Sequence, residues 1–392
     1  MSKTTIVLNQ LQHLLPLPEF ASFVGQHEAD KYVKRLTCRN QLTILLYAQA
    51  TEKDSLRAIQ TSLTIRDSTW HALGLETAAR STLAKANERR PYQIYESLFY
   101  KMLAKCGNLS SGTASDFSFQ NDLRAIDSTT IDLCLNLFPW AKFRTTKGAI
   151  KLHTSFNVRS QIPDVVEITD GKVGDVTAAK GFDFSQYPQG TIFIIDRGYT
   201  DYAFLHSLVE AGHHFVIRLR KNAHVLRLKE HRPPCGNGVL KDEKVGFVLP
   251  KALQDYPEDL RLVTFHDDEH HITYEFLTDE CRLSAANIAL IYKQRWQIEL
   301  FFKWIKQHLK IKTFLGTSKN AVLTQIWVAM IYFLLLAWLQ FQTQFKGTLL
   351  ELTRMVAEVL LDYISIIDLL NLTPKTVRRA LARAGPAQMT LL

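Results

Sequence analysis

The chain has 392 residues, 46% of them hydrophobic, and its 47 basic against 38 acidic residues give a formal net charge of +9. This length allows two or three domains with a sizeable core, and the excess of positive charge favours a polyanionic partner. The five cysteines are scattered and form no C-x-x-C pair, which argues against a zinc or redox motif. We therefore expect a cytoplasmic protein.

Two apolar stretches bear on membrane contact. The first residues lack the continuous apolar core of a signal peptide. The longest apolar run, residues 326–339, is shorter than the ~20 residues that a membrane span needs. It predicts a buried core helix, and we expect no membrane partner.

Residues 11–107 have a helical pattern that prolines and glycines interrupt. Residues 54–60 predict one helix and residues 81–90 a second one, which ends before Pro91. The second helix is expected to expose side chains that can donate to DNA phosphates and base edges: Thr82, Lys85, Asn87, Arg89 and Arg90. The pattern fits a helical DNA-binding domain at residues 1–115 and, equally, a helical bundle with a basic surface.

A stretch rich in Ser, Gly and Asp, residues 108–119, predicts a linker, and strand-like patterns follow it. Strands are predicted at residues 123–133, 149–158, 165–169, 191–195 and 215–220, with a helix at 202–211. This order favours an α/β fold with a mixed sheet and helices on its faces. Asp127 lies on the first strand. Asp196 directly follows a wholly apolar strand of the kind found at the centre of a sheet.

Between residues 222 and 282 the helical period disappears, and strands are predicted at 239–249, 260–265 and 272–277. We interpret this segment as a β-rich insertion. Tyr274 and Phe276 fall on one face of its last strand. The sequence from His266 to His271 is dense in metal-ligand types, but its place between two strands favours a solvated hairpin turn over a metal site.

A helix predicted over residues 292–310 aligns polar side chains on one face: Tyr292, Arg295, Glu299, Lys303, Lys306 and Lys310. The opposite face is apolar and would anchor the helix on a core. One carboxylate among cations is typical of a solvated helix with Glu–Lys pairs, and also of a metal site beside a polyanion.

Three carboxylates on three different elements, Asp127, Asp196 and Glu299, can converge at one end of the sheet. Phosphodiester cleavage by two divalent metal ions requires such a set. Either aspartate alone is more typical of a turn or cap residue than of a catalytic residue.

With these residues the chain resembles the DDE transposases of bacterial insertion sequences, in the branch with a Tyr-Arg-Glu-Lys signature, the insertion-sequence-four family. Its signature Y-x2-R-x3-E-x6-K is met by Tyr292, Arg295, Glu299 and Lys306. The aspartates lie in the sequences AIDST and IIDRGY. The resemblance covers about residues 123–339.

The resemblance implies a ribonuclease-H-like catalytic core at residues 120–221 and 283–340, split by the insertion at 222–282 and followed by a C-terminal helical region at 341–392. It implies that Mg²⁺, or Mn²⁺ in its place, is bound by the catalytic residues Asp127, Asp196 and Glu299. DNA phosphates would be held by Tyr292, Arg295, Lys303, Lys306 and Lys310. A homodimer would act on transposon terminal repeats and target DNA by cut and paste.

Some relatives stack a flipped base on a tryptophan of the insertion, and this insertion has none. Tyr274 and Phe276 are the candidates for that role, or they fill the insertion's own core. Two other functions are weighed: a catalytically inactive DNA-binding regulator derived from a transposase, and a metal-dependent hydrolase of small phosphoesters. The intact carboxylate set argues against the first, and the cations around Glu299 argue against the second.

Overall fold

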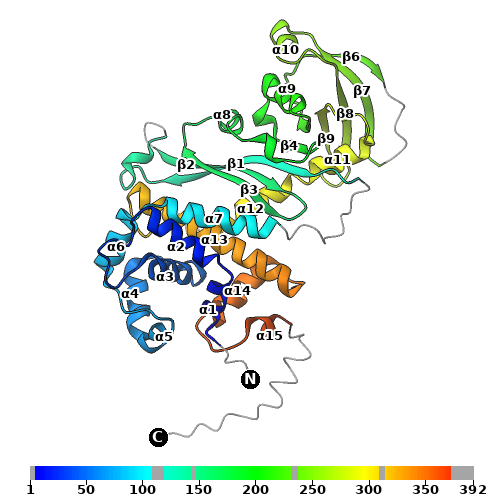
Figure 1. The fold of residues 1–392 in the computed structure, drawn as a ribbon. Helices are drawn as coiled ribbons and strands as arrows, with labels where there is room; N and C mark the ends of the chain where they lie inside the picture. The colour runs from blue at the N-terminus through cyan, green and yellow to red at the C-terminus, as the bar shows by residue number, and fades with distance from the viewer. Residues whose placement is uncertain (1–4, 108–118, 144–146, 231–236, 309–313, 372–392) are drawn as a thin grey trace. The chain divides into compact units, whose positions relative to one another are not determined.

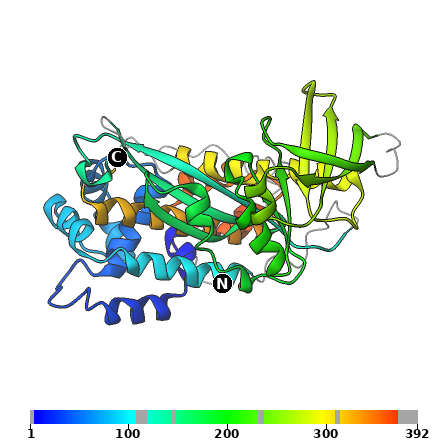
Figure 2. The ribbon, with the colours of Figure 1, turned by 90° about the horizontal axis from the view of Figure 1, so that it is seen from above.

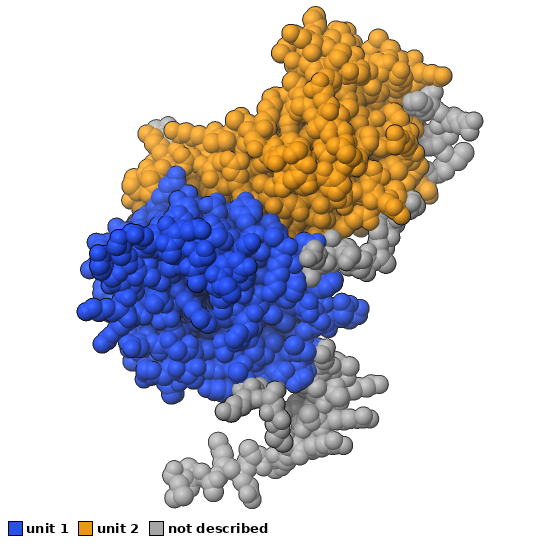
Figure 3. Space-filling model, in the orientation of Figure 1, with its two compact units in different colours: residues 1–109, 307–392 blue, residues 110–306 orange. Residues whose placement is uncertain are grey.

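The computed structural model describes residues 5–107, 119–143, 147–230, 237–308 and 314–371. The chain divides into two compact units (Figure 3). Unit 1 comprises residues 1–109 and 307–392, and unit 2 comprises residues 110–306. The described part of unit 1 is helical, whereas unit 2 is built on a β-sheet (Figure 1).

The described helices of unit 1 are α1 (Val7–His13), α2 (Leu17–Gln26), α3 (Cys38–Ala50), α4 (Leu56–Ile65), α5 (Asp67–Ala72), α6 (Arg80–Arg89), α7 (Gln93–Cys106), α13 (Lys319–Thr343), α14 (Leu349–Val359) and α15 (Ile366–Asn371). Helix α13 is at their centre and packs against α3, α6, α7 and α14. It is long and apolar enough to cross a membrane, but 89% of its most apolar window is buried inside the structure. The apolar run is thus a core helix, as the sequence predicts.

The described part of unit 2 contains nine strands: β1 (Leu123–Leu133), β2 (Gly148–Asn157), β3 (Ile162–Asp170), β4 (Ile192–Ile195), β5 (His214–Arg218), β6 (Val225–Glu230), β7 (Val239–Phe247), β8 (Leu260–Asp267) and β9 (Ile272–Thr278). They form one sheet in the order β3-β2-β1-β4-β5-β9-β8-β7-β6. Strands β1, β4 and β5 are parallel, and the other neighbouring pairs are antiparallel. The predicted α/β class with a mixed sheet is confirmed.

Helices accompany the sheet: α8 (Asp175–Ala179), α9 (Tyr202–Glu210), α10 (Pro250–Asp255), α11 (Ala285–Lys293) and α12 (Trp296–His308), of which the last two residues belong to unit 1. The wholly apolar strand β4 lies between β1 and β5, and its four residues are buried. On one face, Phe193 of β4 and Phe215 of β5 pack with Phe204 of α9. Burying each of these side chains stabilises the fold by about 1.5–3 kcal/mol. Their packing therefore holds the adjacent ends of β4 and β5 in place.

The strands of residues 222–282 continue the same sheet, which Figure 2 shows from above. Strand β9 pairs with β5 in antiparallel register, with Arg218 opposite Phe276. Strand β6 and helix α10 were not predicted, although Pro250 at the first turn of α10 is a recognised start signal.

The prediction of one helix over residues 292–310 is wrong. Helix α11 ends at Lys293, Gln294 and Arg295 form a turn, and α12 begins at Trp296. In this turn the amide of Arg295 donates to the carbonyl three residues before it, so the chain winds more tightly than an α-helix. A constant 100° per residue therefore does not describe the directions of these side chains. Lys310 lies outside the described residues.

Candidate active site

Two aspartates lie side by side on neighbouring parallel strands, Asp127 within β1 and Asp196 directly after the end of β4. Ile126 of β1 pairs with Ile195 of β4, and Asp127 and Asp196 directly follow these two residues. Asp196 retains an extended backbone, with φ −78° and ψ 157°, so it continues the direction of its strand. Arg218, the last residue of β5, lies in the same row. Because residues in one row point to one face, the three side chains share that face of the sheet.

Arg295 joins Asp127 to Glu299. Its Nη1 donates to Asp127 Oδ2 at 3.2 Å, and its Nη2 lies 2.6 Å from Glu299 Oε1. The exposed fraction of the side chains is 17% for Arg295, 19% for Asp127 and 31% for Glu299. Water therefore screens these ion pairs less than it would at an open surface. The turn before α12 is what allows Arg295 to reach both carboxylates.

Tyr292, at the end of α11, approaches the other aspartate. Its hydroxyl donates a long hydrogen bond of 3.4 Å to Asp196 Oδ1, and its ring lies 5.7 Å from the guanidinium of Arg295. Burial raises the pKa of Tyr292 to about 12, so the hydroxyl keeps its proton at neutral pH and can donate. The structure thus brings together five residues from β1, the end of β4, α11, the turn after it and α12: Asp127, Asp196, Tyr292, Arg295 and Glu299.

The electrostatics of this cluster favour a bound cation. The pKa of Asp127 is raised to about 6, mainly by burial and in smaller part by the nearby charges of Asp196 and Glu299. The amide of Ser128, at 2.8 Å, and the guanidinium of Arg295 act in the opposite direction. Three carboxylates supply only hard oxygen donors, which suit Mg²⁺ or Mn²⁺ and not a soft metal ion. The chemistry of these donors therefore fits a divalent metal ion, while in the described structure the guanidinium of Arg295 bridges Asp127 and Glu299.

The two lysines farther along α12, Lys303 and Lys306, are exposed and form no ion pair with other described residues. The pair between Glu299 and Lys303 that a solvated helical face would contain is not formed, because Glu299 pairs with Arg295 instead. Trp296 is 57% exposed at the start of the same helix. This indole was not among the site residues predicted from the sequence.

The two base-stacking candidates differ in access. Phe276 is 2% exposed, with the rings of Tyr274 and Tyr292 at 5.8 and 4.6 Å. Of the two alternatives that the sequence left open for Phe276, the structure therefore favours a core residue, because α11 covers β9 there. Tyr274 is half-buried, and the guanidinium of Arg218 lies 4.7 Å from its ring centroid.

In unit 1, helix α6 covers the predicted second helix to within one residue. Thr82, Lys85 and Arg89 are exposed, as expected. Asn87 is 3% exposed, and its Oδ1 accepts a hydrogen bond of 2.7 Å from the buried Gln41. The expected exposure of Asn87 is therefore wrong.

Arg90 is likewise buried, which contradicts its predicted role at a DNA surface. Its guanidinium donates to Gln41 Oε1 at 2.8 Å and to the carbonyl of Leu36, and it lies 3.5 Å from Asp30. The physical reason is that Arg90 follows the last residue of α6 with an extended backbone, which directs its side chain into the unit. It supports the fold of unit 1.

The acidic segment between β8 and β9 forms the predicted hairpin turn. Ligand atoms of Asp267, Glu269 and His270 lie within 4.8 Å of one another, and the latter two residues are exposed. His270 Nδ1 is 3.0 Å from Asp267 Oδ2, which is a local turn contact.

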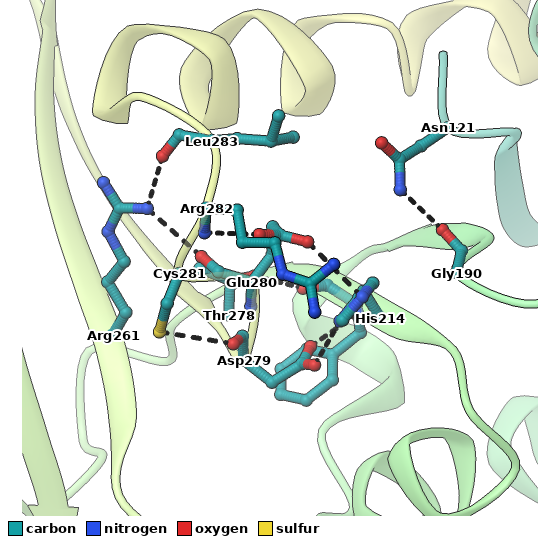
Figure 4. A network of polar contacts seen from close by, with 11 residues as sticks. Asn121, Gly190, His214, Arg261, Thr278, Asp279, Glu280, Cys281, Arg282 and Leu283 are labelled. Carbon is teal, nitrogen blue, oxygen red and sulfur yellow. Dashed lines mark hydrogen bonds and ion pairs between the residues drawn. The ribbon is translucent and has the colours of Figure 1, made fainter. Parts of the chain in front are cut away.

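A polar network ties the end of β9 to the start of α11 (Figure 4). His214 Nδ1 lies 2.6 Å from Asp279 Oδ2, and this hydrogen bond raises the pKa of His214. Arg261 of β8 donates to the carbonyls of Glu280 and Leu283 at 3.1 and 2.7 Å. The insertion thereby holds the segment that leads to Tyr292.

Comparison with known proteins gives a consistent result. Residues 118–335 match the family described as "Transposase DDE domain", and residues 3–76 match a domain of unknown function, DUF4372. A Sinorhizobium fredii protein named as a transposase, y4zB, is 32% identical over 79% of this chain and 85% of its own length. A Geobacillus stearothermophilus protein named as the probable transposase for insertion sequence element IS5377 is 31% identical over 69% of this chain and 70% of its own length. A solved piggyBac transposase synaptic complex with hairpin DNA is 12% identical, with a TM-score of 0.48 over 99% of this chain and 87% of that one.

Proposed function

This chain belongs to the DDE transposases of insertion sequences, and from that membership we propose that it binds the ends of its element and catalyses metal-dependent strand cleavage and strand transfer. The main support is that Asp127 and Asp196 lie side by side on central strands of the sheet and that Arg295 joins Asp127 to Glu299. The strand order β3-β2-β1-β4-β5, with three antiparallel strands followed by two that are parallel to β1, supports a ribonuclease-H-like core.

Asp127, Asp196 and Glu299 would hold Mg²⁺, or Mn²⁺ in its place. When bound, the metal activates a water or a 3′ hydroxyl and stabilises the leaving oxygen. Tyr292 donates to Asp196 and so limits its rotation, while Arg295 keeps Asp127 and Glu299 at a fixed separation. The partial burial of these groups excludes bulk water and strengthens each electrostatic contact.

The DNA would contact the basic residues around the proposed metal site. Lys303 and Lys306 are exposed and unpaired in the described structure, and Arg218 adjoins Asp196. Lysine and arginine at such positions bind phosphates and fix the register of DNA without reading its sequence. We propose that end recognition uses the exposed Lys85 and Arg89 of α6, that a homodimer assembles on the DNA, and that the protein acts on DNA in the cytoplasm.

The second strand would be cut through a DNA hairpin, with Tyr274 as the ring that holds the displaced base. Its partial exposure supports this role. Stacking on an aromatic ring contributes about 1–3 kcal/mol per base, comparable with the cost of removing a base from the duplex.

The proposal is tested with the purified chain, DNA carrying its own element's ends, and Mg²⁺. We expect strand breaks at the element boundary. Asp127→Asn, Asp196→Asn and Glu299→Gln should abolish them while end binding stays nearly unchanged, because these variants keep the side-chain shape and lose the charge that binds the metal. Asp132→Asn is the matched control, since Asp132 is exposed on the same strand as Asp127.

Two results would contradict the proposal. Appreciable cleavage by any one of the three variants would remove that residue from the metal-binding set. Wild-type protein that binds its ends but gives no breaks with Mg²⁺ or Mn²⁺ would instead support a DNA-binding regulator.

A further inference from the structure

A second carboxylate network lies directly behind the proposed metal site. Asp175, the first residue of α8, accepts hydrogen bonds from Ser128 Oγ at 2.7 Å and from Lys151 Nζ at 3.0 Å. His153 Nδ1 is 3.7 Å from the same carboxylate oxygen, and Lys151 also donates to the carbonyl of Val173 at 3.1 Å. Lys151 and His153 are 15% and 1% exposed, so most of this network is inside the unit.

Ser128 connects this network to the proposed site. Its amide donates to Asp127 Oδ1 at 2.8 Å, and its hydroxyl donates to Asp175 Oδ1. Because consecutive strand residues point to opposite faces, Asp127 faces α12 and Ser128 faces α8, which Figure 1 shows on the two sides of the sheet. One residue thus links the carboxylate on the site face to the carboxylate on the α8 face.

The charges of the network explain why it is stable. Burial alone would raise the pKa of Asp175, but the hydrogen bonds from Ser128 and Lys151 lower it overall, so the carboxylate is ionised. Burial lowers the pKa of His153 to about 4, so His153 is neutral near pH 7. Asp175 and Lys151 then form a balanced pair, with Ser128 as an additional donor.

The network does not serve α8 itself. The N-cap of this five-residue helix is Gly174, and no side chain caps it. The hydrogen bonds of Asp175 go to β1 and β2, where they fix the strand segment that carries Asp127.

We propose that Asp175 is a positioning residue for the metal site: through Ser128 it holds the carboxylate of Asp127 in the orientation that faces Asp196 and Glu299. The inference rests on the proposed function, because it concerns the same metal-binding set. Groups that orient metal ligands without touching the metal commonly change metal affinity by about 10–100-fold when they are removed.

The test measures Mn²⁺ binding by the full chain, with and without its end DNA, from the electron paramagnetic resonance signal of free Mn²⁺. Asp175→Ala should weaken Mn²⁺ binding about 10-fold and lower the cleavage rate in proportion at limiting metal, while DNA binding in Ca²⁺ is unchanged. Asp175→Asn keeps an acceptor for Ser128 Oγ and should recover affinity to within about 3-fold of wild type.

Asp201→Ala is the matched control. Asp201 caps α9 by accepting from the amide of Phe204 at 2.8 Å, and it pairs with Lys180 at 2.9 Å, but it has no link to Asp127. Its loss should lower thermal stability and leave Mn²⁺ affinity unchanged. If Asp175→Ala does not fold, Ser128→Ala decides, because it removes only one hydroxyl and should weaken Mn²⁺ binding several-fold.

The outcomes separate the two proposals. Wild-type Mn²⁺ affinity in folded Asp175→Ala or in Ser128→Ala would overturn the positioning role, as would a loss of the same size in Asp201→Ala. A wild-type chain that binds Mn²⁺ but cuts no DNA would overturn the proposed function alone. A wild-type chain that binds no Mn²⁺ would overturn both.

Discussion

Removing the charge of Asp127 should stabilise the metal-free protein. Its pKa is raised from an ordinary value of 3.8 to about 6, so the native state binds the proton more tightly than the unfolded chain does. The stability that this proton provides is fully present below 3.8 and is lost as the pH rises through about 6. At about 1.4 kcal/mol per pH unit, the loss approaches 3 kcal/mol near neutral pH and is about half of that at pH 5. With only 19% of the Asp127 side chain exposed, solvent screening removes little of it.

Asp127→Asn avoids this loss while it keeps an oxygen acceptor for the amide of Ser128. In a chelating buffer, its denaturation midpoint should therefore exceed that of wild type near neutral pH, and the difference should shrink between about pH 6 and pH 4. Added Mn²⁺ should raise the wild-type midpoint and leave that of the variant unchanged, because ligand binding stabilises the native state. Asp132→Asn should follow wild type throughout. A variant less stable than wild type near neutral pH, or a difference independent of pH, would refute the reasoning.

Two contrasts between neighbouring residues test the corrected assignments. Arg90→Ala should destabilise the protein by roughly 3–5 kcal/mol in thermal denaturation, because it leaves buried partners unpaired, and an unchanged midpoint would show that the buried contacts contribute nothing. Arg89→Ala should change the free energy of unfolding by no more than about 0.5 kcal/mol. It should lower the slope of log affinity for the DNA ends against log salt concentration by about one, because one phosphate contact is lost. An unchanged slope would show that Arg89 does not contact the DNA. Phe276→Ala should cost about 3–5 kcal/mol of stability. Tyr274→Ala should reduce the hairpin product on denaturing gels without slowing the first nick, and wild-type reactions that never give a hairpin would exclude the stacking role.

Local pattern was sufficient for most strands of the sheet, though not for β6, and it located the two candidate aspartates. The period-two alternation in residues 123–133 and the apolar run in residues 191–195 identified β1 and β4. The parallel pairing of these two strands in the structure then places Asp127 and Asp196 in one row. Glu299 was identified from the family signature together with the two aspartates, because its helix face alone also fitted a solvated helix, and that helix begins later than predicted. The turn at Arg295 was beyond such reasoning, because the sequence there contains neither glycine nor proline to mark a break.

Burial that depends on distant partners could not be predicted. Arg90 is held by Asp30 and by Gln41, which is 49 residues away in the chain. Phe276 is covered because β9 pairs with β5 and α11 packs over it, and neither fact follows from the local pattern around residue 276. A basic or aromatic side chain on an amphipathic segment has the same local pattern whether it faces DNA or a core.

The pairing of β9 with β5 sets the distance between the proposed metal site and the aromatic rings of β9. Adjacent strands lie about 4.8 Å apart, so the row from Asp196 through Arg218 to Phe276 spans about 10 Å. At about 3.4 Å per nucleotide along one strand, this separation corresponds to roughly three nucleotides. If Tyr274 holds a displaced base, the strand spacing fixes how far that base stands from the phosphate that is cut. A shift of one residue in the pairing of β5 with β9 would turn Tyr274 to the other face of the sheet, and its ring would then no longer lie at a fixed distance from the cut phosphate.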